Sequence, residues 1–190
     1  MVTAEEAKSI ILRLCEGSSP DERFAIQSCE PSPSGDYWVV RANSEDFVVH
    51  GVFERCYVGV NAHLVKTASG AVETVGSGQS VEQYLEDKYD LERAAGSYYV
   101  LQPSFDKTDK VALINLRQKL GLSLQESIAL LSMGRSQWLT GKRSVLKHAQ
   151  DLLCEQGIEV DIVLRQDVLG AVEIDERAEH LDALKPYIRA

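Results

Sequence analysis

The chain has 190 residues, a length that allows either one large domain or two small ones. Its apolar content of 44% and charged content of 26% are those of a globular protein and exclude wholesale disorder. Its longest apolar runs, such as residues 128–131, fall far short of the roughly 18 residues of a membrane span, so we expect no membrane association.

The net charge is −9, and most of the acid lies in the N-terminal half. Residues 1–96 hold 16 acidic and 8 basic side chains, whereas residues 97–166 have a net charge of +2 and residues 167–190 one of −3. An acidic half repels nucleic acid and steers a basic protein partner toward itself. Acidic surfaces also serve solubility, and composition leaves both roles open.

Glu5 and Glu6 stand where a secretory signal has basic residues, so we expect a cytoplasmic protein. The cysteines and histidines are scattered and have no metal-ligand spacing, which predicts reduced thiols and no metal or cofactor site. They are Cys15, Cys29, Cys56, Cys154, His50, His63, His148 and His180.

No motif indicates catalysis. Residues 70–78 contain three glycines but lack the Gly-Lys-Ser/Thr ending of a phosphate loop. No Gly-x-Ser-x-Gly elbow is present, and no cysteine is paired locally with a histidine. We therefore expect a binding protein and not an enzyme.

The N-terminal half predicts a helix, an antiparallel sheet and a second helix. Thr3 and Glu6 form a capping box for a helix over residues 4–16, and Ser80 with Gln83 starts another that reaches residue 91. Apolar, β-branched and aromatic runs separated by turn residues predict strands over residues 24–29, 37–42, 47–53, 56–60, 63–66 and 71–75. The second helix is amphipathic, and the face predicted to be exposed to solvent is acidic, with Glu82, Glu86, Asp87 and Asp90.

A boundary near Gly96 separates a second lobe with the order β-α-α-β-α-β. Its strands are expected over residues 98–101, 138–140 and 158–164, and its helices over 108–120, 123–132 and 144–157. Gly121 is the hinge between the first two helices. The predicted domains are thus 1–96 and 97–166, followed by an extension over 167–190 with a helix at 175–187 that is bent at Pro186. The predicted fold class is α+β.

The second lobe resembles the C-terminal domain of the bacterial ribosomal stalk protein. The matching segments are 98–101, 110–114, 116–117, 121–126 and 157–161. In that family a lysine-rich helix-hinge-helix face recruits translation factors. The recruiting lysine falls here on Ile114, the second hinge glycine on Ser123, and lysines that flank Glu126 on Gln125 and Ile128. The resemblance therefore implies the same scaffold with a different partner.

The first lobe resembles the YrhB-like, immunity protein 35 family of bacterial polymorphic toxin systems over residues 1–92. The matching segments are 3–7, 37–40, 58–61, 64–65, 69–72, 76 and 81–85. Lys66 matches the family's charged residue after the strand, whereas Thr67 departs from the pattern before the turn. The resemblance implies an immunity protein that binds a cognate toxin in the cytoplasm and occludes its active or substrate surface.

Two other functions fit parts of the sequence. Residues 116–123 also resemble the start of a helix-turn-helix repressor, whose DNA contacts would be Arg135, Gln137, Lys142, Arg143 and Lys147. The +2 charge of that lobe and the strand signal at 158–164 oppose this alternative. A small holdase chaperone is the other, because proteins of the immunity group have also been viewed as chaperones.

The expected partner is a cognate protein toxin, and the candidate contacts are acidic. They are Glu45, Asp46, Glu82, Glu86, Asp87 and Asp90. Trp38 has two interpretations, a partner anchor or a core residue, of which the core is the commoner for a lone aromatic inside an apolar strand.

Overall fold

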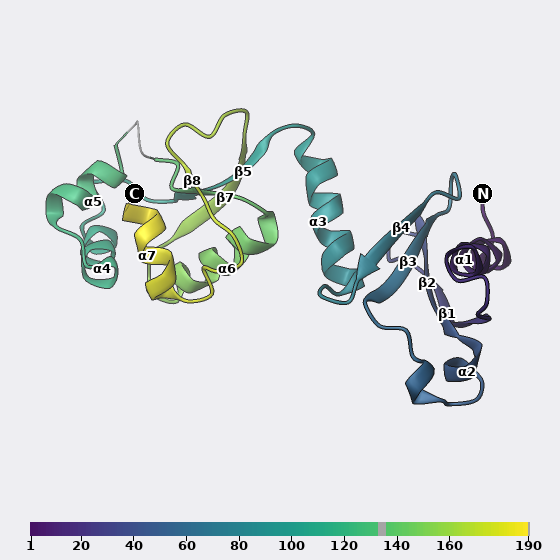
Figure 1. Ribbon diagram of the computed structural model, residues 1–190. Helices are drawn as coiled ribbons and strands as arrows, with labels where there is room; N and C mark the ends of the chain where they lie inside the picture. The colour runs from purple at the N-terminus through teal and green to yellow at the C-terminus, as the bar shows by residue number, and fades with distance from the viewer. Residues whose placement is uncertain (133–135, 190) are drawn as a thin grey trace. The chain divides into compact units, whose positions relative to one another are not determined.

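A computed structural model of the chain describes residues 1–132 and 136–189 (Figure 1). The chain forms two compact units, Met1–Leu85 and Glu86–Ala190. Helix α3 (Val81–Ala94) spans the boundary, so the division falls inside this helix and before the boundary expected near Gly96. Helices and two sheets are both present, which confirms the α+β class.

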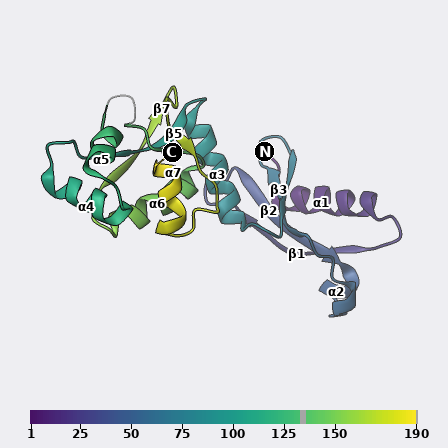
Figure 2. The same ribbon diagram turned by 60° about the vertical axis from the view of Figure 1, so that its left-hand side comes forward.

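Unit 1 is a four-stranded antiparallel sheet covered by helix α1 (Ala4–Ser18). The strands β1 (Phe24–Pro31), β2 (Tyr37–Ser44), β3 (Val60–Lys66) and β4 (Val72–Gly76) lie in sequence order. Figures 1 and 2 show α1 along one face of this sheet. Short helical segments, α2 (Glu45–Val48) and η1 (Phe53–Arg55), fill the connection between β2 and β3.

The core under α1 follows from the alternation of side chains along β2 and β3. Val40 and Val65 point toward α1 and pack, fully buried, against Ala7 and Ile11. Trp38 pairs with Val65 in register and is half-buried, and its indole Nε1 donates a hydrogen bond to the Val2 carbonyl at 2.9 Å. Trp38 thus belongs to the packed face of the sheet.

The opposite face of the sheet carries a second buried layer, of which Val39 and Leu64 are members. Glu73 of β4 anchors this side: its carboxylate accepts hydrogen bonds from the hydroxyls of Tyr37, at 3.2 Å, and Tyr84, at 2.8 Å. Tyr84 lies on the first turn of α3, so these bonds fix the start of that helix to unit 1.

Unit 2 contains a second sheet with the strand order β7-β5-β6-β8. Its elements are β5 (Tyr98–Pro103), α4 (Lys110–Leu120), α5 (Leu124–Leu130), β6 (Leu139–Thr140), α6 (Arg143–Cys154), β7 (Val160–Arg165), β8 (Val172–Glu173) and α7 (Leu181–Arg189). The predicted β-α-α-β-α-β order is therefore present. Leu101, Leu116, Leu139, Leu146 and Leu153 are fully buried in one core between the sheet and the helices.

The segment after β7 is part of this core and is not a separate tail. Strand β8 pairs in parallel with β6, and Ile174, Leu184 and Ile188 are buried in the same cluster as Leu101. The guanidinium of Arg189 donates hydrogen bonds to the carbonyls of Leu120 and Gly121 at the C-terminus of α4. The α4–α5 hinge is thus held by the last helix.

The strands predicted between β2 and β3 are absent. Residues 47–53 and 56–59 are not strand, because the chain forms α2 and η1 there. The reason is local polar chemistry, since Ser44 caps α2 by accepting a hydrogen bond from the Phe47 amide at 3.1 Å. Side-chain bonds of this kind offer the backbone an alternative to a strand ladder.

Candidate functional site

The connection between β2 and β3 together with the first residue of β3, here called the 45–60 segment, exposes an unusual amount of apolar surface. Among the described residues, six of its large apolar side chains are exposed: Val49, Val52, Phe53, Tyr57, Val58 and Val60. Phe53 is 78% exposed and Val58 is 88% exposed. Single exposed apolar residues are common, but a cluster within one segment is typical of an interaction site.

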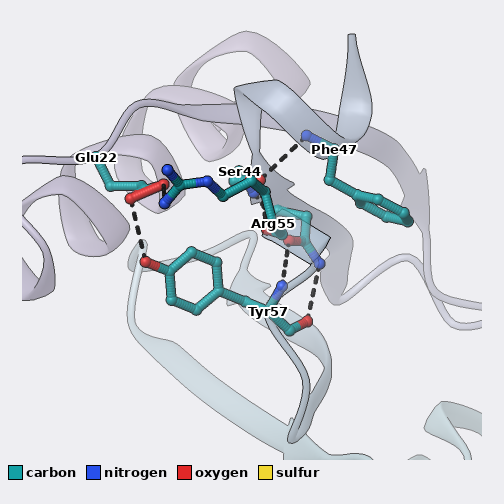
Figure 3. A network of polar contacts seen from close by, with 6 residues as sticks. Glu22, Ser44, Phe47, Arg55 and Tyr57 are labelled. Atoms are coloured by element: carbon teal, nitrogen blue, oxygen red, sulfur yellow. Dashed lines mark hydrogen bonds and ion pairs between the residues drawn. The ribbon is translucent and has the colours of Figure 1, made fainter. Parts of the chain in front are cut away.

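Two buried polar residues at the end of β2 hold this segment in place, and Figure 3 shows one of them, Ser44. The Asn43 side chain donates to the Tyr57 carbonyl at 2.9 Å and accepts from the Tyr57 amide at 2.8 Å. The Ser44 hydroxyl donates to the Arg55 carbonyl at 2.6 Å. The segment is therefore tied to the sheet by side chains that satisfy its backbone, which makes it a defined surface and not a loose loop.

Aromatic contacts support the same arrangement. The rings of Phe47 and Phe53 meet edge to face with centroids 5.8 Å apart, and those of Phe24 and Tyr57 lie 5.4 Å apart. The Tyr57 hydroxyl points toward Glu22 and donates a hydrogen bond to its carboxylate at 3.3 Å (Figure 3). Phe53 is thus exposed to solvent while its ring rests against that of Phe47. A rigid aromatic loses little entropy when a partner covers it.

The charges beside the apolar residues are mainly acidic. Asp46 and Glu54 are exposed and Glu45 is half-exposed. The Arg55 guanidinium lies 3.9 Å from the Glu22 carboxylate, so the positive charge of Arg55 is partly neutralised. Unit 1 as a whole has 12 acidic and 6 basic residues, a net charge of −6. Two predicted contacts, Glu45 and Asp46, therefore lie at the start of the apolar segment.

The other predicted contacts divide into two groups. Glu82 and Glu86 are exposed on α3, as expected. The pKa of Glu82 is lowered by a hydrogen bond from its own backbone amide, by a second from the Ser80 hydroxyl and by the nearby Arg41. Both side chains are exposed, so a partner can reach them.

The expectation that Asp87 and Asp90 face outward is wrong. Asp90 is only 3% exposed, and its carboxylate lies 3.0 Å from the Arg93 guanidinium and 3.8 Å from that of Arg143. Asp87 is half-buried and accepts a hydrogen bond from the Ser144 hydroxyl at 2.7 Å. Their positions three residues apart place both carboxylates on one helix face, which meets the N-terminus of α6.

The same contacts occupy basic residues that a DNA-binding protein would need. Lys142 lies 3.3 Å from Asp87, Arg143 pairs with Asp90, and Lys147 lies 2.8 Å from Asp151. Gln137 is half-buried, and Arg135 lies outside the described residues. Cations already paired within the protein contribute little to phosphate attraction, so the described part of unit 2 gives the helix-turn-helix alternative little support.

Residues 1–132 and 136–189 contain neither a metal-binding cluster nor a membrane-spanning helix. No group of three histidine, cysteine, aspartate or glutamate side chains there could hold a metal ion. No helix in these residues combines the length and the apolar character needed to cross a membrane. The 45–60 segment is therefore the strongest candidate site that the described residues offer.

Comparisons with known proteins give no match. No protein-family model matches the chain, and neither a curated protein nor a solved structure matches it significantly. Sequence reasoning missed Phe53 and Val58, because an apolar run with strand-forming residues predicts a buried strand.

Proposed function

We propose that the chain is an immunity protein of a bacterial polymorphic toxin system, which binds its cognate toxin in the cytoplasm through the 45–60 segment. The observation that carries the proposal is the exposed apolar cluster around Phe53, in a segment whose backbone is bound by Asn43 and Ser44 and which is flanked by acidic side chains. Interfaces are centred on such aromatic anchors and surrounded by polar residues.

The charge pattern favours a toxin with a basic substrate surface. Asp46, Glu54 and the −6 charge of unit 1 attract such a surface and speed the encounter. Full burial of a phenylalanine or valine contributes about 1.5–3 kcal/mol per side chain, so Phe53 and Val58 are the expected hot spots. A toxin covered in this way loses access to its substrate, and no chemistry by the immunity protein is required.

The test is growth rescue by co-expression with the toxin encoded beside this gene in the native host. Phe53→Asp combined with Val58→Asp should abolish rescue and toxin capture, because both place charge in the apolar centre of the interface. Leu169→Asp is the matched control, since Leu169 is an equally exposed apolar residue, at 72%, on unit 2. Rescue that survives the double variant, or no rescue by the wild type, contradicts the proposal.

The acidic residues give a second, graded test. Reversal of Glu45 and Asp46 to lysine should lower toxin affinity and weaken its dependence on salt, because the attraction to a basic surface is lost. Reversal of Glu82 and Glu86 tests the exposed acidic part of α3 in the same assay. Asp87 is not a useful probe, because its reversal would break the contacts with Ser144 and Lys142.

A holdase chaperone is the second candidate, since exposed apolar surface of the kind seen at Phe53 also captures unfolded chains. Light scattering of a heated, unrelated client enzyme separates the two functions. Suppression of aggregation that depends on Phe53 and Val58, without rescue from the toxin, would favour the chaperone.

A further inference from the structure

Strand β7 of unit 2 has a free edge. In the sheet order β7-β5-β6-β8, β7 is terminal, and among the described residues it pairs with β5 alone. Asp161, Leu164 and Arg165 are exposed and Ile162 and Val163 are half-exposed, so the strand is accessible along most of its length. An exposed edge of this length is a template for another strand.

The hydrogen-bonding groups of this edge can be assigned. Val160 lies opposite Pro103, which has no N–H to donate. The Val160 carbonyl accepts a hydrogen bond from the side-chain amide of Gln150 at 2.7 Å. Val160 therefore directs its backbone groups away from β5. Because this direction alternates along a strand, Ile162 and Leu164 also present their N–H and C=O groups to the free edge.

The side chains of β7 are complementary to those of a second β7 in the reverse direction. An antiparallel pair centred on Val163 places Asp161 opposite Arg165 of the other copy, at both ends. It also places Ile162 opposite Leu164, the two residues whose backbone groups are available. Opposite charges and paired apolar side chains both stabilise cross-strand neighbours.

This pattern differs from the usual protection of edge strands. Protected edges carry like charges, proline or bulges, which repel or misalign a second copy. Here the charges at the two ends of the strand are of opposite sign. The Arg165 guanidinium donates a 2.7 Å hydrogen bond to Gln102 of the neighbouring strand β5, and it exchanges this bond for Asp161 of the other copy in the pairing described above. Asp161 has no ion-pair partner among the described residues, so its carboxylate is available to the arginine of another copy.

We propose that β7 pairs with β7 of a second copy of this chain, in the antiparallel register centred on Val163, and so forms a two-fold symmetric dimer with one continuous sheet. The contact is small, so the dimer is expected to be weak, with a dissociation constant in the micromolar range or above. It lies on unit 2 and is independent of the toxin surface proposed on unit 1.

Sedimentation velocity of the full chain from about 1 µM to about 500 µM tests the dimer. Asp161→Lys alone and Arg165→Asp alone should each weaken association by about tenfold or more, because each places like charges opposite one another at both ends. An equimolar mixture of the two variants should restore it, since every facing pair is then attractive. A monomer throughout this range, or a dimer that neither variant weakens, overturns the proposal.

Oxidative cross-linking tests the register. Val163 lies on the two-fold axis at a non-hydrogen-bonded pair, where Cα atoms are about 4.5 Å apart, within the range of a disulfide. In a Cys154→Ser background, Val163→Cys should cross-link to itself, as peptide mapping would show. Leu164→Cys is the control, because its equivalent in the second copy lies more than about 7 Å away. Equal cross-linking at both positions overturns the register.

Discussion

Replacement of Asn43 by alanine is expected to release the 45–60 segment from the sheet. The residue is only 8% exposed, and its side chain accepts hydrogen bonds from the amides of Ser44 (2.9 Å) and Tyr57 (2.8 Å) and donates one to the Tyr57 carbonyl (2.9 Å). At about 1 kcal/mol for each bond, the loss of three lowers the free energy of unfolding of unit 1 by about 3 kcal/mol. Asn43→Asp keeps both acceptor bonds but should not restore stability at neutral pH, because it buries a carboxylate and places one of its oxygens against the Tyr57 carbonyl.

Hydrogen exchange and urea unfolding measure the two consequences separately. Amides of residues 55–60 should exchange faster in Asn43→Ala, whereas those of β5 and β7 in unit 2 should not change. If the proposed function is correct, toxin affinity falls as well, because Phe53 is no longer presented on a rigid base. A stability loss below about 0.5 kcal/mol with unchanged exchange at Tyr57 would refute the reasoning, since the bonds would then contribute nothing.

Three further predictions concern stability. Arg189→Ala should lower the free energy of unfolding of unit 2 by about 1.5–3 kcal/mol, because it removes charge-assisted bonds to the end of α4; thermal unfolding beside Arg189→Lys measures this. Gly141→Ala should lower the free energy of unfolding by at least about 2 kcal/mol, because φ is +151° and the new Cβ would lie 2.6 Å from the Ile174 carbonyl oxygen. Gly78→Ala, where the new Cβ meets open space, is the control in the same denaturant titration. Burial lowers the pKa of His63, so the unfolded chain binds the proton first and wild-type stability should fall as the pH drops below about 6.5. Urea midpoints measured at neutral and acid pH should fall less steeply for His63→Gln than for the wild type. Equal slopes for the two proteins would count against this assignment.

Local signals were sufficient for most of the secondary structure. The Thr3–Glu6 capping box starts α1 as expected, and Gly121 adopts the left-handed conformation, with φ at 65°, between α4 and α5. The hairpin of β3 and β4 is present, as is the strand at 98–101. These elements depend on residues three or four apart or on alternation, so the neighbouring sequence contains the information.

The acidic composition and the amphipathic character of α3 were also available from the sequence. The sequence could not distinguish Glu82 and Glu86, which remain exposed, from Asp87 and Asp90, whose carboxylates contact other side chains of the protein. The difference arises from Ser144 and Arg143, more than 50 residues further along the chain. Periodicity gives the face of a helix but not what covers that face.

The sequence by itself therefore determined the α+β class, the order of the elements and the excess of acid in the first half. Only the tertiary structure decided that the apolar 45–60 segment lies outside the core, because Asn43 and Ser44 bind its backbone and divert it from a strand. It also decided that β7 is a terminal strand. Exposure and strand order depend on long-range packing, and no local pattern of residues contains them.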